Sequence, residues 1–189
     1  MIYNPDKHHR RSIRMKGYDY SQCGFYFITL CVNKRLCLFG EVSDGKMKLN
    51  DAGKSIEEVW KDIPEYYPDV NIDTFIVMPN HLHGIIILHK EFVEAPPRGR
   101  PIIIENGQAR RPAPTLGDIV GRFKSLTMHK YNLGTQNLNW KSYHRKLWQR
   151  NYYERIIRNE NELNIIREYI NENPINWEID EENPKNNNP

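Results

Sequence analysis

The chain has 189 residues, of which 39% are hydrophobic and 27% charged, a balance typical of one globular domain with appendages rather than of a disordered protein. Its longest apolar run, Gly84 to Leu88, is far too short to span a bilayer, and residues 1–16 lack the apolar segment of a secretory signal. The three cysteines, an odd number without a Cys-x-x-Cys pair, argue against a disulfide framework or a zinc ribbon. We therefore expect a cytoplasmic protein with reduced thiols and no membrane partner.

Basic residues are segregated along the chain although the formal net charge is only +3. One block lies in residues 1–16, and a second extends from residue 98 to residue 150, where the acids are Glu105 and Asp118. Such blocks are typical of proteins that bind nucleic acid. Composition alone is equally compatible with a solvated surface that is balanced by the acidic C-terminal region.

Hydrophobic periodicity and turn residues predict the elements in chain order. The expected strands are 25–32, 36–39, 46–49, 70–77 and 82–89, and the expected helices are 51–63, 116–131 and a last one from a cap at Asn161 to about Pro174. Asn50 or Asp51 is expected to cap the first helix, and Thr115 the second. Short adjacent strands joined by brief turns favour an antiparallel sheet with helices packed on it, which is an α+β fold.

The predicted domain covers residues 17–178 and has appendages at both ends. Residues 1–16 form a basic N-terminal arm, residues 90–114 a proline-rich insertion, and residues 179–189 a polar tail that we expect to be disordered.

His81 and His83 lie one residue apart at the start of a predicted strand, so both side chains point to the same face of the sheet. Two imidazoles on one face can share a divalent metal. A lone His-x-His pair is more often an ordinary polar pair, because two ligands leave a metal site incomplete.

Tyr169 and Asn173 are four residues apart and therefore share one face of the last predicted helix. If that face packs near the histidines, the Asn173 amide oxygen supplies a third ligand, and the set suits Mg²⁺ or Mn²⁺ with positions open for phosphate. Tyr169 could then attack a phosphodiester and form a covalent phosphotyrosine. A helix tyrosine among isoleucines is more often a core residue, and Tyr152 and Tyr153 are rival nucleophiles; the residues alone do not choose among the three.

Five segments carry a resemblance to a known family: Arg14 to Tyr20, Phe25 to Leu30, Met78 to Gly84, Trp148 to Glu154, and Tyr169 to Pro174. In this order they resemble the REP-associated tyrosine transposases, the IS200-like branch of the HUH single-tyrosine transposases, over roughly residues 10–178. The resemblance implies a ferredoxin-like (RRM-like) antiparallel sheet of the HUH endonuclease fold. It also implies Tyr169 as nucleophile and His81, His83 and Asn173 as metal ligands, while Tyr152 and Tyr153 become packing or DNA-contact residues.

The activity implied by the resemblance is cleavage and rejoining of single-stranded DNA beside short hairpins, with Mg²⁺ or Mn²⁺ and a 5′-phosphotyrosine intermediate, by a monomer or a homodimer at the nucleoid. From charge alone, the expected DNA-binding residues are Arg10, Arg11, Arg14, Arg122, Lys124 and Arg150. Two alternatives stay open. One is a domesticated regulator that binds hairpin nucleic acid without cleaving it, and the other is a metal phosphoesterase that uses activated water.

Overall fold

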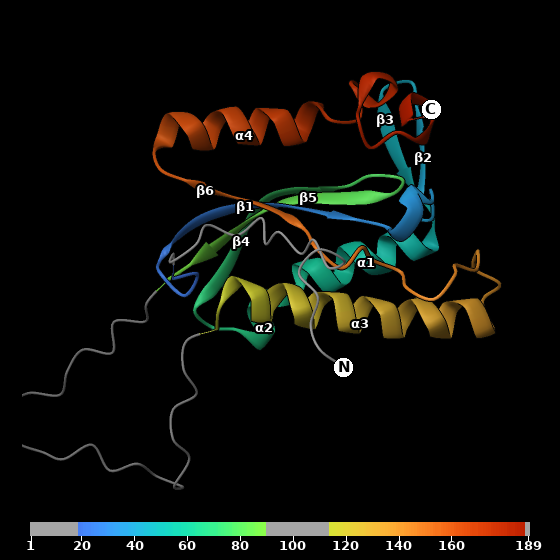
Figure 1. The fold of residues 1–189 in the computed structure, drawn as a ribbon, viewed down its shortest axis with the longest axis horizontal. Helices are drawn as coiled ribbons and strands as arrows, with labels where there is room; N and C mark the ends of the chain where they lie inside the picture. The colour runs from blue at the N-terminus through green and yellow to red at the C-terminus, as the bar shows by residue number, and fades with distance from the viewer. Residues whose placement is uncertain (1–18, 90–113, 188–189) are drawn as a thin grey trace, which may run out of the picture.

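The structure is a computed structural model that describes residues 19–89 and 114–187. Its centre is a four-stranded antiparallel sheet in the order β4-β5-β1-β6 (Figure 1). The strands are β1 (Gly24–Cys31), β4 (Val70–Val77), β5 (His81–Leu88) and β6 (Tyr153–Ile157). A separate hairpin of β2 (Gly40–Ser43) and β3 (Lys46–Leu49) stands at one end of this sheet.

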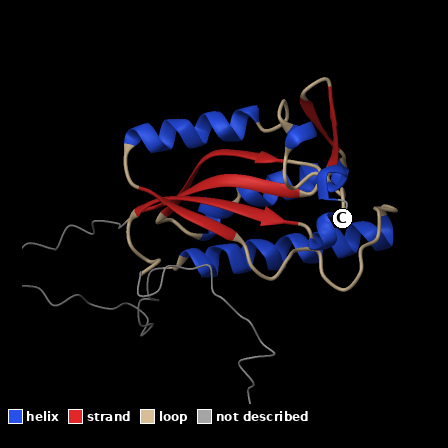
Figure 2. Cartoon of the chain, turned by 45° about the horizontal axis from the view of Figure 1, so that its top comes forward, coloured by secondary structure: helices blue, strands red, loops and turns tan. Residues whose placement is uncertain are grey.

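Helices cover both faces of the sheet unequally (Figures 1 and 2). On one face lie α1 (Asp51–Lys61), the short α2 (Ile63–Tyr66) and the long α3 (Leu116–Asn137), while α4 (Glu160–Glu172) crosses the other. Leaving aside the hairpin and α2, the order is β-α-β-β-α-β followed by α4, with the first and third strands paired at the centre. This confirms the predicted ferredoxin-like α+β fold. No helix in residues 19–89 or 114–187 is long and apolar enough to cross a membrane.

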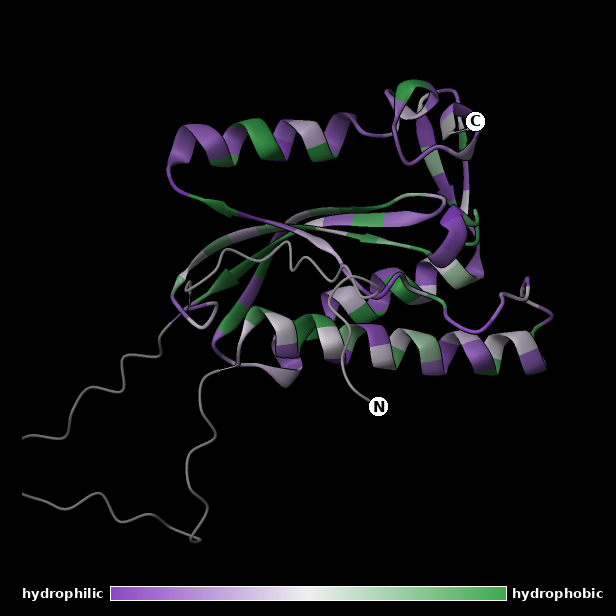
Figure 3. Ribbon diagram, in the orientation of Figure 1, coloured by the Kyte–Doolittle hydropathy of each residue, from purple (hydrophilic) through white to green (hydrophobic). Residues whose placement is uncertain are grey.

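Alternation along β1 divides the protein into two cores. Tyr26, Ile28 and Leu30 point towards α1 and α3 and are fully buried in the larger cluster, whereas Phe27 joins a smaller cluster under α4. Figure 3 shows apolar residues along the strands between the helical layers and alternating apolar and polar bands on α4. The α4 face of the sheet is therefore free to hold polar residues, because most apolar burial takes place on the other face.

Gly84 allows α1 to approach β5 beside the histidine pair. A Cβ at this position would lie 2.5 Å from the ring of Trp60, which is fully buried. The two helix caps predicted from the sequence are also confirmed: the Asn50 side chain accepts from Gly53 N–H, and Thr115 forms a capping box with Asp118.

Several predicted boundaries were wrong. The first hairpin strand is Gly40–Ser43 rather than 36–39, and α4 begins after a cap at Asn159 rather than Asn161. Helix α3 continues to Asn137 through Gly134, where a turn was expected, and Trp140 packs against this glycine. Strand β6 was not predicted, since an edge strand of five residues with charged Glu154 and Arg155 has little periodicity of its own.

The C-terminal segment was expected to be disordered from residue 179, but it is folded through residue 187. The 3₁₀ turns Trp177–Ile179 and Pro184–Asn187 frame it, and Asn183, 2% exposed, donates its amide N–H to the carbonyl of Trp177. The polar composition of this segment predicted disorder, but its polar side chains form hydrogen bonds to backbone groups and so hold it folded. The basic arm at 1–16 and nearly all of the insertion at 90–114 lie outside the described residues, so the proposed division of the chain stays a prediction.

One ion pair ties α4 to the sheet. The guanidinium of Arg167 on α4 donates to both carboxylate oxygens of Asp73 on β4, at 2.9 and 2.6 Å. This contact lowers the pKa of Asp73 to about 2. Arg167 lies two residues before Tyr169, so the pair helps to set how α4 rests on the sheet.

We expect Arg167→Met to lower the free energy of unfolding, because Asp73 loses its charged partner. Since the pKa of Asp73 is lowered on folding, the contribution is full above about pH 4 and disappears as the pH falls towards 2. Urea unfolding across this range measures it. Lys61→Met, which breaks an exposed pair with Glu57, is the matched control. An Arg167→Met effect that does not change with pH would contradict the ion-pair explanation.

Candidate active site

The two histidines lie side by side in the central strand β5, and both are buried. His81 is fully buried and His83 is 3% exposed, with ring centroids 4.5 Å apart. Their partners across β1 are Cys31 and Thr29, respectively. The histidines therefore share the α4 face of the sheet, as the alternation predicted.

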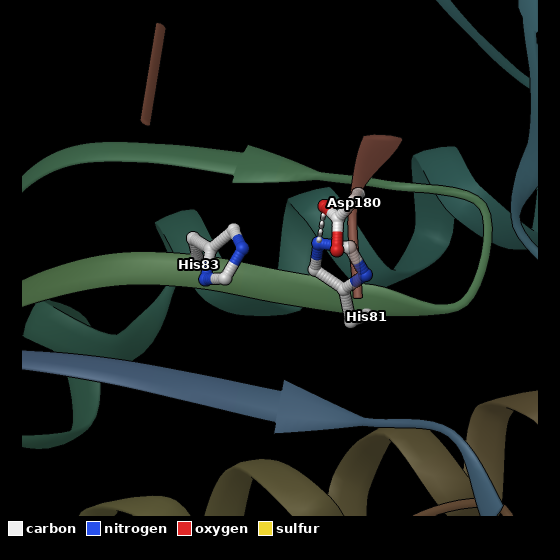
Figure 4. A group of neighbouring side chains, drawn as sticks. All are labelled: His81, His83 and Asp180. Atoms are coloured by element: carbon white, nitrogen blue, oxygen red, sulfur yellow. Dashed lines mark ion pairs between the residues drawn. The ribbon is translucent and has the colours of Figure 1, made fainter. Parts of the chain in front are cut away.

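A third side chain, not predicted from the sequence, joins them. Asp180, in the folded C-terminal segment, has its Oδ2 3.9 Å from Nε2 of His81 (Figure 4). Ligand atoms of His81, His83 and Asp180 all lie within 4.8 Å of one another, so this group could bind a metal ion. The only signal in the sequence was the acidic run at 180–182, which is indistinguishable from ordinary polar surface.

The last helix brings Tyr169 to the same place. Its hydroxyl lies 3.4 Å from Nε2 of His83, and its ring packs 6.0 Å edge-on from Phe27. Asn173 follows α4 directly as its C-cap and is 3% exposed. The four residues predicted from distant parts of the chain are thus brought together, and of the three tyrosines considered, Tyr169 is the one whose hydroxyl reaches a histidine.

Three buried acceptor atoms of this site find no hydrogen-bond donor within the described part of the chain: Nε2 of His81, Oδ1 of Asn173 and Oδ2 of Asp180. A buried polar atom without a partner is costly, and three converging acceptors are rare in a protein interior. A bound cation would satisfy all three, because imidazole nitrogen, amide oxygen and carboxylate are metal ligands. The donor set thus fits a divalent metal.

Burial sets the protonation of the site. It lowers the pKa of His81 to about 4, against the opposing effect of Asp180, and it lowers the pKa of His83 well below the usual value, with His81 adding to the shift. Both rings are therefore neutral near pH 7 and have a lone pair to share. Burial, followed by the charges of Asp180 and Glu182, raises the pKa of Tyr169, so its phenol is protonated.

Asn80 determines which nitrogen of His81 carries the proton. Its amide N–H₂ donates to the carbonyls of Arg35, at 3.1 Å, and Glu182, at 2.7 Å. The amide oxygen is thereby turned to Nδ1 of His81, 2.9 Å away, and accepts a hydrogen bond from the Nδ1–H group. Nε2 is left unprotonated and faces Asp180, which is the arrangement that a metal-binding histidine needs.

We expect Asn80→Ala to weaken Mn²⁺ binding by about 10- to 100-fold, because His81 loses the acceptor that orients it. Titration calorimetry measures the affinity, and ¹⁵N shifts of the His81 ring report the position of the proton, which a merely structural effect would not move. The exposed Asn71, which pairs with His89 on the sheet edge, supplies the control Asn71→Ala. Unchanged affinity with an unchanged ring proton would rule out this role for Asn80.

The three predicted basic residues that the structure describes, Arg122, Lys124 and Arg150, are dispersed rather than gathered at the site. Arg122 lies over the ring of Tyr66, 4.2 Å from its centroid, on the helical layer across the sheet, and Arg150 is exposed. Lys124 points inward and donates to the carbonyls of Gln149, Arg150 and Asn151, at 2.8, 3.4 and 3.3 Å. Its amine therefore holds the loop that leads into β6. Arg10, Arg11 and Arg14 lie outside the described residues.

A cavity of about 920 Å³ opens between the sheet and α4, beside the histidines, Tyr169 and Asp180. His83, Tyr169 and Asp180 form part of its wall, together with the loop from Gln149 and the first residues of β6. The site is therefore accessible to a ligand of the size of a nucleotide.

Comparison with known proteins places the chain among its relatives. No model of a known protein family matches it. A curated protein of Haemophilus influenzae (strain ATCC 51907 / DSM 11121 / KW20 / Rd), described as "Uncharacterized protein", is 42% identical over 184 residues, which cover 95% of this chain and 96% of that protein. A solved structure of a REP-associated tyrosine transposase bound to a REP hairpin aligns with a TM-score of 0.56 and 17% identity over 87% of this chain and 73% of its own. A putative transposase from Deinococcus radiodurans aligns with a TM-score of 0.48 and 13% identity over 85% of this chain and 98% of its own.

The class that emerges is structural: the chain has the fold of the REP-associated tyrosine transposase, as the resemblance in its sequence predicted. The H. influenzae protein is related to this chain by sequence as well, because the two are 42% identical over nearly their whole lengths. The chain belongs to the same protein family as the H. influenzae relative.

Proposed function

We propose that this protein is a metal-dependent endonuclease and strand transferase that acts on single-stranded DNA near hairpin sequences, with Tyr169 as nucleophile. One observation carries the proposal. The Tyr169 hydroxyl lies 3.4 Å from Nε2 of the buried His83, beside acceptor atoms that have no donor among residues 19–89 and 114–187. A nucleophile beside ligand atoms that could hold a divalent ion is an arrangement suited to transesterification of a phosphodiester.

The metal would be held by His81, His83 and Asn173, with Asp180 as a further ligand. Two imidazoles with amide and carboxylate oxygens suit Mn²⁺ or Mg²⁺. When bound, such an ion withdraws charge from a non-bridging phosphate oxygen and orients the phosphorus.

The covalent step belongs to Tyr169. Its oxygen attacks the phosphorus, the bond from phosphorus to the 3′ oxygen breaks, and a 5′-phosphotyrosine and a free 3′-hydroxyl result. The phenol loses one proton to solvent and the leaving 3′ oxygen takes one up. Because the new ester keeps the energy of the broken linkage, a 3′-hydroxyl can reverse the step and join strands without another energy source.

The fold neighbour supports hairpin DNA as the partner, since its structure holds a REP hairpin. A hairpin stem is a dense line of phosphates, which basic side chains bind in a salt-dependent way. Arg122 and Arg150 are exposed and available for such contacts, and we propose Arg10, Arg11 and Arg14 in the basic arm as further ones. The part of Lys124 would be indirect, through the loop that it holds.

We expect Tyr169→Phe to abolish a covalent adduct that wild-type protein forms with hairpin-flanked single-stranded oligonucleotides in Mn²⁺, because the attacking oxygen is removed. Denaturing gel electrophoresis of labelled DNA detects the adduct. Tyr152→Phe is the matched control, since that ring packs by Lys124 instead of the histidines.

The possible outcomes separate the alternatives. Cleavage without an adduct, retained in Tyr169→Phe, would indicate a phosphoesterase that uses water. Salt-sensitive binding without cleavage in any divalent metal would indicate a regulator. An adduct that survives in Tyr169→Phe would assign the nucleophile elsewhere.

We expect His81→Ala to abolish cleavage while hairpin binding changes by less than about tenfold, because phosphate contacts dominate affinity. Electrophoretic mobility shifts measure the hairpin binding.

We expect Asp180→Asn to weaken Mn²⁺ binding at least about tenfold, since the ion loses a charged ligand. Calorimetry measures the metal affinity. Glu181→Gln is the control for charge, because this neighbouring carboxylate lies outside the group of ligand atoms. Equal losses for Asp180→Asn and Glu181→Gln would make the Asp180 effect one of net charge.

A further inference from the structure

We infer that Tyr153 is a stacking platform for a nucleobase next to the phosphate that Tyr169 attacks, so that the cavity between β6 and α4 binds a single-stranded nucleotide by its base as well as by its phosphate. This inference rests on the proposed function and names the part of the substrate that the cavity takes.

Tyr153 is placed in line with the candidate site by the register of the sheet. Thr29 on β1 pairs with His83 on one side and with Tyr153 on the other. All three side chains therefore lie in one row on the α4 face. Two strand spacings separate His83 from Tyr153, about 10 Å, which is within the reach of one nucleotide from its phosphate to its base.

The ring of Tyr153 is about half exposed. It stands on the edge strand β6, is 47% exposed, and touches Phe27 edge-on, with ring centroids 6.1 Å apart. Phe27 in turn contacts both His83 and Tyr169. An exposed aromatic ring on a concave wall is the usual means by which proteins bind single-stranded bases, because every base has a flat face to stack.

The charges around the cavity orient such a nucleotide. Asp180, Glu181 and Glu182 line it from the C-terminal segment, whereas Phe27 lines it from β1 and Tyr153 from β6. Arg155 of β6 also lines the cavity, but its guanidinium is paired with Glu162. A phosphate is repelled by the carboxylates except where a cation neutralises them, and a neutral base is not. With a cation held at the ligand atoms, the phosphate is therefore directed to them and the base to the aromatic side.

The loop before β6 completes this subsite. Gln149 and Asn151 line the same cavity, and the Lys124 amine fixes the backbone carbonyls of both. Amide side chains carry a donor and an acceptor and can pair with the edges of bases. A held backbone presents them at a constant distance from the Tyr153 ring.

The test measures binding, in Mn²⁺, of two fluorescent ligands by the non-cleaving Tyr169→Phe protein. One ligand is a short oligothymidylate, and the other is an abasic chain of equal length and charge. We expect Tyr153→Leu to bind the oligothymidylate about 5- to 100-fold more weakly, because one stacked base is lost, and to bind the abasic chain as before. Tyr153→Phe keeps the ring and should bind both ligands as the parent protein does. Leu133→Ala, at a residue of α3 in the opposite layer that is 44% exposed, is the control.

Each outcome decides one point. Equal losses for both ligands in Tyr153→Leu, or no loss for either, would overturn the stacking role while leaving the proposed function intact. A loss in Tyr153→Phe as large as in Tyr153→Leu would also overturn it, since the hydroxyl rather than the ring would then be responsible. If the parent protein binds neither ligand, single-stranded DNA is not its partner, and the proposed function fails together with this inference.

Discussion

The burial of two neutral imidazoles in the central strand β5 is the constraint on which the rest of the site depends. Each ring nitrogen that faces the protein has a partner: Nδ1 of His81 donates to Asn80, and Nδ1 of His83 pairs with Thr29 at 2.8 Å. Their Nε2 atoms are thereby directed to one point between the sheet and α4, which Asp180, Asn173 and Tyr169 approach from other segments. Without these partners, the rings could turn freely and the point of convergence would be lost.

One face of the sheet carries most of the hydrophobic core, and the other carries the candidate site. The large cluster under α1 and α3 holds the sheet rigid, whereas α4 rests on a cluster of six buried residues and on the pair of Arg167 with Asp73. A lightly packed helix is lower in local stability than the core that it covers. The nucleophile thus stands on a helix with few buried contacts, whereas the two histidines stand in the central strand of the sheet.

The acidic C-terminal segment is at first unexpected beside a proposed DNA site. Arg35 pairs with Glu182 at 2.9 Å, and Asn80 bonds to the Glu182 carbonyl, so the segment is part of the site's frame. Burial and then the Asp180 charge raise the pKa of Tyr169, and the same charge repels phosphate. A bound divalent ion would offset the Asp180 charge in both effects, which couples the nucleophile to the metal through electrostatics.

The amino-acid sequence by itself determined the elements with strong periodicity, two helix caps, the shared face of His81 and His83, and the shared helical face of Tyr169 and Asn173. These follow from local geometry, because strand and helix periods act over a few residues. The tertiary structure alone decided the pairing of β6, the arrival of Asp180 at the histidines, the tautomer imposed by Asn80 and the inward turn of Lys124. Each of these depends on a contact between residues far apart in the chain, such as Asn80 with Glu182 or Lys124 with Gln149, and no local pattern records which distant backbone carbonyl a buried amide or amine will meet.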